Sequence, residues 1–365
     1  MKITFFLIAF CLVFLRMYFL WTGHWGHNGN NGSIVISSDG DYEVRIKWSG
    51  KVKFTDDETA IASITPGGYL KYSFNEKKMT AESNLQGDIA YTLYDGHQTL
   101  PLNDSGRKFL AASIREIFAD GFDAEGRADR VAARGGKRAL LEEAGKFKSS
   151  YIRGLYLDRL FKNDSLTRDD LQGLLIHIGE LDGDYEKEQY LKRFSAVQLE
   201  DTVLVGAWLG AVENIHSDDN KKNLLIRLIK KDSLSNGSFN KVLDISETLG
   251  GDWDKENVLG TLIDKGGLSA GQIERVLEAV RHLGPDPDKE NMYRKLIARD
   301  GMMETEWENL IGEVALIGPD YDKSNLLVQI AREMPRTDNL KAAYLKAART
   351  IGADPEYGRA MRAIQ

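Results

Sequence analysis

The sequence predicts an α+β protein built from an N-terminal transmembrane helix, a small antiparallel β module and an α-solenoid of 34-residue helix-turn-helix repeats. Three observations carry this prediction. Residues 3–21 are apolar except for Arg16, apolar and polar residues alternate between residues 34 and 102, and an Asp-x-acid-Lys stretch recurs at a step of 34 residues. The expected parts are an anchor or signal at 1–22, a linker at 23–33, the β module at 34–104, short helices at 105–149 and the solenoid at 150–365.

The N-terminal apolar run is long enough to cross a bilayer. Nineteen residues of helix span roughly 28 Å, which matches one hydrocarbon core. Tyr18, Trp21 and Trp25 fit an interfacial aromatic belt, and Arg16 can reach the headgroups. The alternative is a cleaved signal peptide with its apolar region at residues 3–15, but residues 16–26 contain no small-x-small cleavage site. The sequence therefore favours an uncleaved anchor, with Lys2 inside and the body on the periplasmic side of a bacterial inner membrane.

Residues 23–33 are rich in Gly and Asn, which is typical of a flexible linker. From residue 34 the pattern becomes period-two, with turn signals such as Ser49-Gly50 and Pro66-Gly67-Gly68 between the alternating runs. This predicts six or seven antiparallel strands. Residues 108–119 and 128–133 have helical periodicity and are expected to lead into the repeats.

The repeats are defined by columns of residues 34 positions apart. An Asp opens each repeat and is expected to cap the first helix, where its carboxylate accepts from free N–H groups of the first turn. A Gly after the second helix is expected to be the left-handed residue of a C-cap. Between them, two apolar columns run along each helix, so neighbouring repeats must stack to bury them. The Asp column is Asp184, Asp218, Asp252, Asp286, Asp320 and Asp354, and the Gly column is Gly250, Gly284, Gly318 and Gly352.

Counted from Ser150, the pattern gives six full repeats and a C-terminal half repeat. A right-handed stack of this kind resembles HEAT and TPR arrays. The Trp-Leu-Gly-Tyr and Ala-Phe-Pro positions typical of TPR are absent, so neither family is assigned.

Composition restricts the classes of function. The net charge of −7 is spread along the chain, which argues against a nucleic-acid-binding face. Cys11 is the only cysteine, so an internal disulfide and a Cys-based zinc site are excluded. No catalytic motif is found, and no cofactor is expected.

Three polar groups have a functional interpretation and a simpler one. The Asp-x-Asp pairs at 252/254, 286/288 and 320/322 enter helices at once, so capping is favoured over calcium binding. His24 and His27 lack a third metal ligand, so membrane anchoring is favoured. The acidic run Asp56-Asp57-Glu58 is interpreted as a solvated turn, since no partner for acid–base chemistry is identifiable.

One basic helix face is a candidate binding surface for an acidic partner, although such faces are usually only solvated. Its residues are Lys221, Lys222, Arg227, Lys230 and Lys231.

The stretch from Gly50 to Lys71 (GKVKFTDDETAIASITPGGYLK) resembles a segment of membrane-anchored bacterial proteins of unassigned function, many from Bacteroidota. These resemble the non-catalytic sensor-side regions that accompany antibiotic-sensor-type membrane peptidases. The resemblance covers the β module and, loosely, the repeats. It implies a partner or an ectodomain, because the zinc motif of the peptidase is absent.

These observations predict a non-enzymatic, membrane-tethered scaffold that binds a protein or peptide in the cell envelope. Two alternatives remain open. One is an envelope enzyme, or its regulatory subunit, acting on cell-wall or glycan material, and the other is a ligand sensor coupled to a membrane partner.

Overall fold

A computed structural model describes residues 31–38, 42–162, 165–230, 234–284 and 286–365. It divides into two compact units. The sheet unit comprises Met1–Glu143 with Gly154–Arg159, and the helical array comprises Ala144–Arg153 with Leu160–Gln365. An antiparallel sheet followed by many helices confirms the α+β class. The expected anchor at 1–22 and most of the expected linker lie outside the described residues. Within the described part of the chain, every helix is too short or too polar to span a bilayer.

The sheet unit contains a six-stranded antiparallel sheet and a two-stranded one. The larger sheet has the order β1-β2-β5-β6-β7-β8, so only the β2–β5 neighbours are not consecutive in the chain. The smaller sheet pairs β3 with β4 and has an irregularity between Lys53 and Phe54. The first strand begins three residues before the expected start of the β module. The strands are β1 (Asn31–Ser38), β2 (Tyr42–Ser49), β3 (Val52–Phe54), β4 (Ile61–Ile64), β5 (Tyr69–Phe74), β6 (Lys77–Ser83), β7 (Ile89–Asp95) and β8 (Gln98–Leu100).

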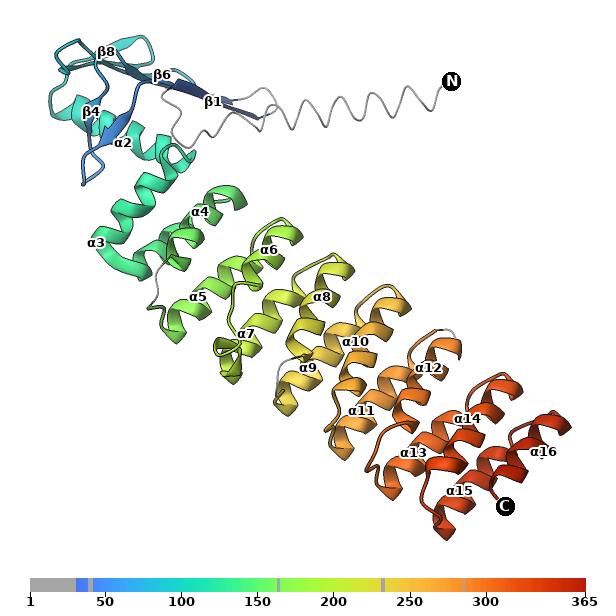
Figure 1. The fold of residues 1–365 in the computed structure, drawn as a ribbon. Coiled ribbons are helices and arrows are strands. Elements are labelled where there is room, and N and C mark those ends of the chain that lie inside the picture. Colours follow the sequence, from blue (N-terminus) through green and yellow to red (C-terminus); the bar gives the residue numbers. More distant parts are fainter. Residues whose placement is uncertain (1–30, 39–41, 163–164, 231–233, 285) are drawn as a thin grey trace, which may run out of the picture. The chain divides into compact units, whose positions relative to one another are not determined.

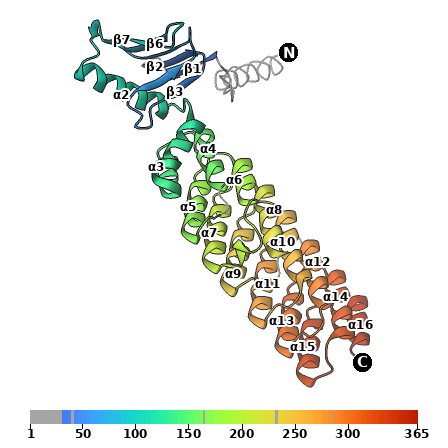
Figure 2. The ribbon, with the colours of Figure 1, turned by 60° about the vertical axis from the view of Figure 1, so that its left-hand side comes forward.

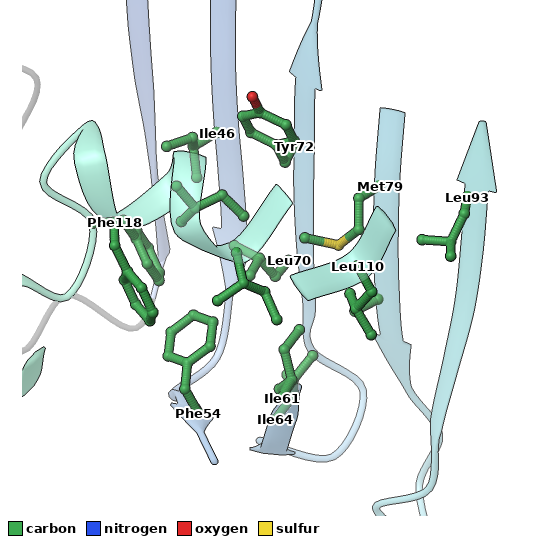
Figure 3. Packing of buried hydrophobic residues seen from close by; sticks show 14 of the residues in the cluster. Ile46, Phe54, Ile61, Ile64, Leu70, Tyr72, Met79, Leu93, Leu110 and Phe118 are labelled. Carbon is green, nitrogen blue, oxygen red and sulfur yellow. The ribbon is translucent and has the colours of Figure 1, made fainter. Parts of the chain in front are cut away.

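Helix α2 (Asp104–Ala119) covers one face of the larger sheet, and the core of the unit lies between them (Figure 3). Ile46, Leu70 and Met79 reach this core from the larger sheet because alternate strand residues point to the same face. Phe54 of the smaller sheet packs edge-on against Phe118 of α2, with ring centroids 4.6 Å apart. The helix therefore completes the β module. The sequence predicted a helix here but not the surface it covers, because an amphipathic pattern does not show which apolar surface a helix packs against.

Helix α3 (Ala124–Ala144) also belongs mainly to the sheet unit and is longer than the expected 128–133. It is interrupted at Gly136, whose φ of 66° and ψ of −157° lie outside the helical region. Only glycine adopts such a conformation readily, so this residue marks the break in the helix.

The helical array is a stack of helix pairs whose members recur at the 34-residue interval predicted from the sequence (Figure 1). The even-numbered helices are called A helices here and the odd-numbered ones B helices. The A helices are α4 (Ser150–Phe161), α6 (Asp184–Leu191), α8 (Asp218–Ile229), α10 (Asp252–Lys265), α12 (Asp286–Ile297), α14 (Asp320–Glu333) and α16 (Asp354–Ala363). The B helices are α5 (Arg168–Gly179), α7 (Thr202–Glu213), α9 (Asn236–Glu247), α11 (Ala270–Arg281), α13 (Glu304–Val314) and α15 (Asp338–Ala348).

From α5 onward, successive A helices pack against each other and so do successive B helices, which gives two layers (Figures 1 and 2). The predicted apolar columns lie between these layers. The column Leu191, Leu225, Leu259, Tyr293 and Leu327 is buried in the A helices. Trp208, Val242, Val276, Leu310 and Tyr344 are buried in the B helices. At about 1.5–3 kcal/mol for each large apolar side chain removed from water, stacking is the main source of stability.

Candidate partner-binding surface

The aspartates that open the A helices connect neighbouring repeats. Each is the first helical residue, and in α6, α8, α10, α14 and α16 the residue before it has the extended backbone of an N-cap. The Asp184 carboxylate accepts hydrogen bonds from the backbone N–H groups of His216 (3.0 Å) and Ser217 (2.8 Å), in the loop before the next A helix. Asp320 accepts in the same way from Gly352 (3.0 Å) and Ala353 (2.9 Å). The predicted N-cap position was wrong by one residue, because the N-cap is the residue before the Asp. We call the hydrogen bonds from these aspartates to the next repeat aspartate links.

The aspartate links also explain the glycine column. Gly250 donates to Asp218 at 2.8 Å and Gly318 donates to Asp286 at 3.3 Å. None of the four column glycines has a positive φ, so the predicted left-handed cap is wrong. A Cβ would instead stand 2.8–3.5 Å from the carboxylate of the preceding repeat. Glycine leaves room for that carboxylate in these four repeats, whereas His216 holds the same position after Asp184 and its N–H group makes the same hydrogen bond.

In four repeats a lysine three residues after the aspartate, part of a lysine column, lies close to its carboxylate. Lys187 lies 3.6 Å from Asp184 and donates to the Asn214 carbonyl at 2.6 Å. Lys323 lies 4.0 Å from Asp320 and donates to the Thr350 carbonyl at 3.2 Å. Both lysine side chains are buried, so each aspartate has a nearby counter-charge away from bulk solvent. In α4, the first A helix, Ser150 and Arg153 occupy the positions of the linking Asp and the column Lys. Ser150 Oγ donates to Asp182 at 2.8 Å, and Arg153 donates to the Phe147 carbonyl at 2.9 Å.

Most residues of the predicted basic face make contacts inside the array. Lys221 and Lys222 are buried, and Lys222 pairs with Asp219 at 2.7 Å and Asp254 at 2.9 Å. Its hydrogen bond to Asp219 raises the pKa of the Lys222 ammonium.

Arg227 of the same helix donates to the carbonyls of Leu191 (3.4 Å) and Phe194 (3.0 Å), and burial lowers the pKa of its guanidinium. Lys230 is exposed, and Lys231 lies outside the described residues. Of the four basic residues that the structure describes, only Lys230 is exposed.

Exposed aromatic side chains recur at the second residue of the A helices. They are Tyr151 (41% exposed), Tyr185 (66%), Trp253 (65%) and Tyr321 (60%), and we call them the aromatic column. The same position holds Asp219, Pro287 and Pro355 in the other A helices. Large apolar side chains are usually exposed singly, so four at one register position of a stack mark an interaction surface.

The electrostatic environment of the aromatic column is acidic. The first four residues of the six A helices from α6 to α16 include twelve acidic and five basic residues. The rings attract the cations that are present. Lys222 Nζ lies 4.4 Å from the Trp253 ring centroid, and the Arg359 guanidinium lies 5.0 Å from that of Tyr321. In the part of the chain that the structure describes, no Lys or Arg lies over the Tyr185 ring.

A second polar site lies within the sheet unit, where the sequence predicted a solvated turn. Asp57 does form such a turn, accepting from the hydroxyls of Thr55 (2.6 Å) and Thr59 (2.9 Å). Glu58, however, is buried.

The buried Glu58 carboxylate meets Arg127 (3.2 Å), Arg130 (3.3 Å) and Arg134 (3.3 Å) from α3. Arg130 also pairs with Asp123 at 2.9 Å. The three arginines follow an i, i+3, i+7 spacing, a signal of one helix face that sequence reasoning did not use. Because Glu58, Asp123 and the three arginines all have partners of opposite charge, the cluster fixes α3 against the β3–β4 turn.

A titratable carboxyl group, that of Asp120, lies at the C-terminal end of α2. The Tyr72 hydroxyl donates to Glu116 at 2.6 Å. Burial is the main cause of the raised pKa of Tyr72, and this hydrogen bond is the second cause. Burial and the charge of Glu116 raise the pKa of Asp120 to about 6. A carboxyl group with such a pKa exchanges protons near neutral pH, which is a property of general acids and bases.

No group of three or more His, Cys, Asp or Glu side chains in the described residues is arranged to hold a metal ion. Comparisons with models of known protein families, with curated proteins and with solved structures found no match.

Proposed function

We propose that the chain is a non-enzymatic, membrane-tethered scaffold. Its helical array, an α-solenoid of 34-residue helix-turn-helix repeats, binds a protein or peptide partner in the cell envelope. The apolar run at residues 3–21 is the proposed tether, and the body is proposed to lie on the periplasmic side.

The observation that carries this proposal is the contrast between two sets of periodic residues. The aspartate and lysine columns are used within the array, where they connect one repeat to the next. The aromatic column has the same period but remains exposed. Exposed aromatic residues on a rigid repeat surface are typical of binding sites, since Tyr and Trp bury large areas at low entropic cost.

Site-specific photo-crosslinking tests the scaffold. A benzophenone amino acid placed at Tyr185, Trp253 or Tyr321 of the full chain is expected to cross-link one discrete envelope protein. The matched control is Ile176, which is 60% exposed on α5 but outside the aromatic column. The identified partner is then purified and rebound to the purified chain. Cross-linking that is absent at all three positions, or equal at Ile176, refutes the proposal.

The tether is tested separately. The full chain is expected to remain in membranes after carbonate extraction and to be cut by protease added to spheroplasts. Release by carbonate, or protection from protease, contradicts the proposed anchor or its orientation.

The alternative of an envelope enzyme is favoured by one observation, the pKa of about 6 for Asp120 beside Glu116 in the sheet unit. If these carboxyl groups act on glycan, the full chain turns over purified cell-wall material, and Asp120→Asn abolishes the reaction. No turnover by the wild-type chain between pH 5 and 8 eliminates this alternative.

A further inference from the structure

We propose that the aromatic column binds a basic polypeptide segment in an extended conformation, with Lys or Arg side chains over successive rings. This inference rests on the proposed scaffold function and specifies its partner. The segment runs along the stacking direction of the A helices.

The charge of the surface selects a cationic occupant. Carboxylates occupy the first and third positions of the helix around each of Tyr185, Trp253 and Tyr321. Lys187, Lys255 and Lys323 lie 3.6–4.0 Å from the first carboxylate of each helix, and Lys222 pairs with Asp254, so the net negative charge beside the rings is that of Glu186 and Asp322. A cation over an aromatic face is attracted by the ring and by nearby carboxylates together. An acidic segment would meet this negative charge beside Tyr185 and Tyr321.

The chain's own cations show that the rings accept such a partner. Lys222 lies over Trp253 and Arg359 lies over Tyr321, at 4.4 and 5.0 Å. Both rings still expose more than half of their surface, so a second cation has a face to approach. Tyr185 exposes as much and is flanked by Asp184 and the exposed Glu186.

The spacing of the repeats favours an extended backbone. Packed helices lie about 9 Å apart, and an extended or polyproline II chain advances about 3.1 Å per residue. One repeat therefore corresponds to about three residues of ligand. Tyr185, Trp253 and Tyr321 are separated by two repeats each, so their three cations would be about six residues apart. A helical ligand advances only about 1.5 Å per residue and would need twice as many.

The test uses the purified full chain in detergent and fluorescent 18-residue peptides. One peptide carries Lys at every third position among Gly, Ser and Pro. A second has the same composition with its lysines clustered at one end, a third has Glu in place of Lys, and a fourth is uncharged. Fluorescence anisotropy gives each Kd at 50 and 300 mM salt.

The peptide with evenly spaced lysines is expected to bind most tightly and to weaken at high salt. Tyr185→Ala, Trp253→Ala and Tyr321→Ala are each expected to weaken it about two- to fivefold, and the triple variant to abolish binding. Ile176→Ala, the matched exposed control, is expected to leave the Kd unchanged. Arg359→Met removes a competing cation from the Tyr321 ring and is expected to tighten binding.

Equal binding of the Glu or uncharged peptide, no preference for spaced over clustered lysines, or wild-type binding by the triple variant overturns the inference. If no peptide binds while the aromatic column still cross-links a protein, the basic segment is wrong and the scaffold stands. If neither occurs, both proposals fail.

Discussion

Removing one aspartate link is expected to release the last helix of the array. Asp320 accepts hydrogen bonds from the N–H groups of Gly352 and Ala353, at 3.0 and 2.9 Å, and so ties the start of α14 to the loop before α16. In Asp320→Ala both bonds are lost. Helix α16 packs mainly on α14 and α15, so the effect is concentrated at this junction.

The magnitude follows from the kind of bond that is lost. A hydrogen bond to a charged group contributes about 1.5–3 kcal/mol. Gly352 is exposed and Ala353 is half-buried, so water replaces part of each bond. We therefore expect a net loss of about 2 kcal/mol, which corresponds to roughly 30-fold more frequent opening of α16.

Hydrogen exchange measured by mass spectrometry reports this opening directly. Peptides covering Asp354–Ala363 are expected to exchange roughly 30-fold faster in Asp320→Ala, while those covering Asp218–Ile229 are unchanged. Asp338→Ala is the matched control because Asp338 is also the first residue of its helix but is exposed. Its loss removes only the interaction with the helix dipole, at most about 1 kcal/mol. If the two variants exchange equally in α16, the aspartate link does not hold the repeats together.

Three further changes test other parts of the structure. Glu58→Gln leaves the partly buried Arg127 and Arg130 and the exposed Arg134 without their shared carboxylate and is expected to cost about 3 kcal/mol in urea unfolding of the sheet unit; a cost below 1 kcal/mol would show that the cluster is not structural. The pKa of Asp120 is raised from 3.8 to about 6 beside Glu116, so folding stability should fall as pH rises from 4 to 6; Asp120→Asn should be equal to wild type at pH 4 and about 2 kcal/mol more stable at pH 8, and parallel pH profiles would contradict this. Gly352→Ala, whose Cβ would stand 3.5 Å from a carboxylate, should raise Tm slightly, whereas Gly250→Ala, at 3.1 Å, should lower it; the same shift in both would refute the steric explanation of the column.

The repeat period and the apolar columns could be predicted because each column samples the same local environment many times. Leu191, Leu225 and Leu327 are all buried, as the 34-residue spacing indicates. The role of the aspartates was harder to predict from the sequence. An Asp at the N-cap and an Asp at the first helical position differ by one residue, and only coordinates show that Asp184 reaches a loop 32 residues later.

The environment of single residues could not be predicted when it depends on distant segments. Glu58 looks like part of a solvated acidic turn, but its partners Arg127 and Arg130 follow about 70 residues later. Lys222 looks like part of a basic face, yet the carboxylate of Asp254 and the ring of Trp253 come from the next repeat. The aromatic column was present in the repeated stretch itself, but its exposure became visible only with the stack.

The aspartate links restrict how this chain can change in length. Each carboxylate meets an N–H group 32 or 33 residues later, across two helices and their connections. One extra residue within either helix rotates the rest of that helix by about 100° and carries the donor away from the acceptor. Duplicating a whole repeat, by contrast, recreates every donor and acceptor at its original separation. An engineered array of this type should therefore tolerate the insertion or deletion of complete 34-residue blocks far better than that of one or two residues.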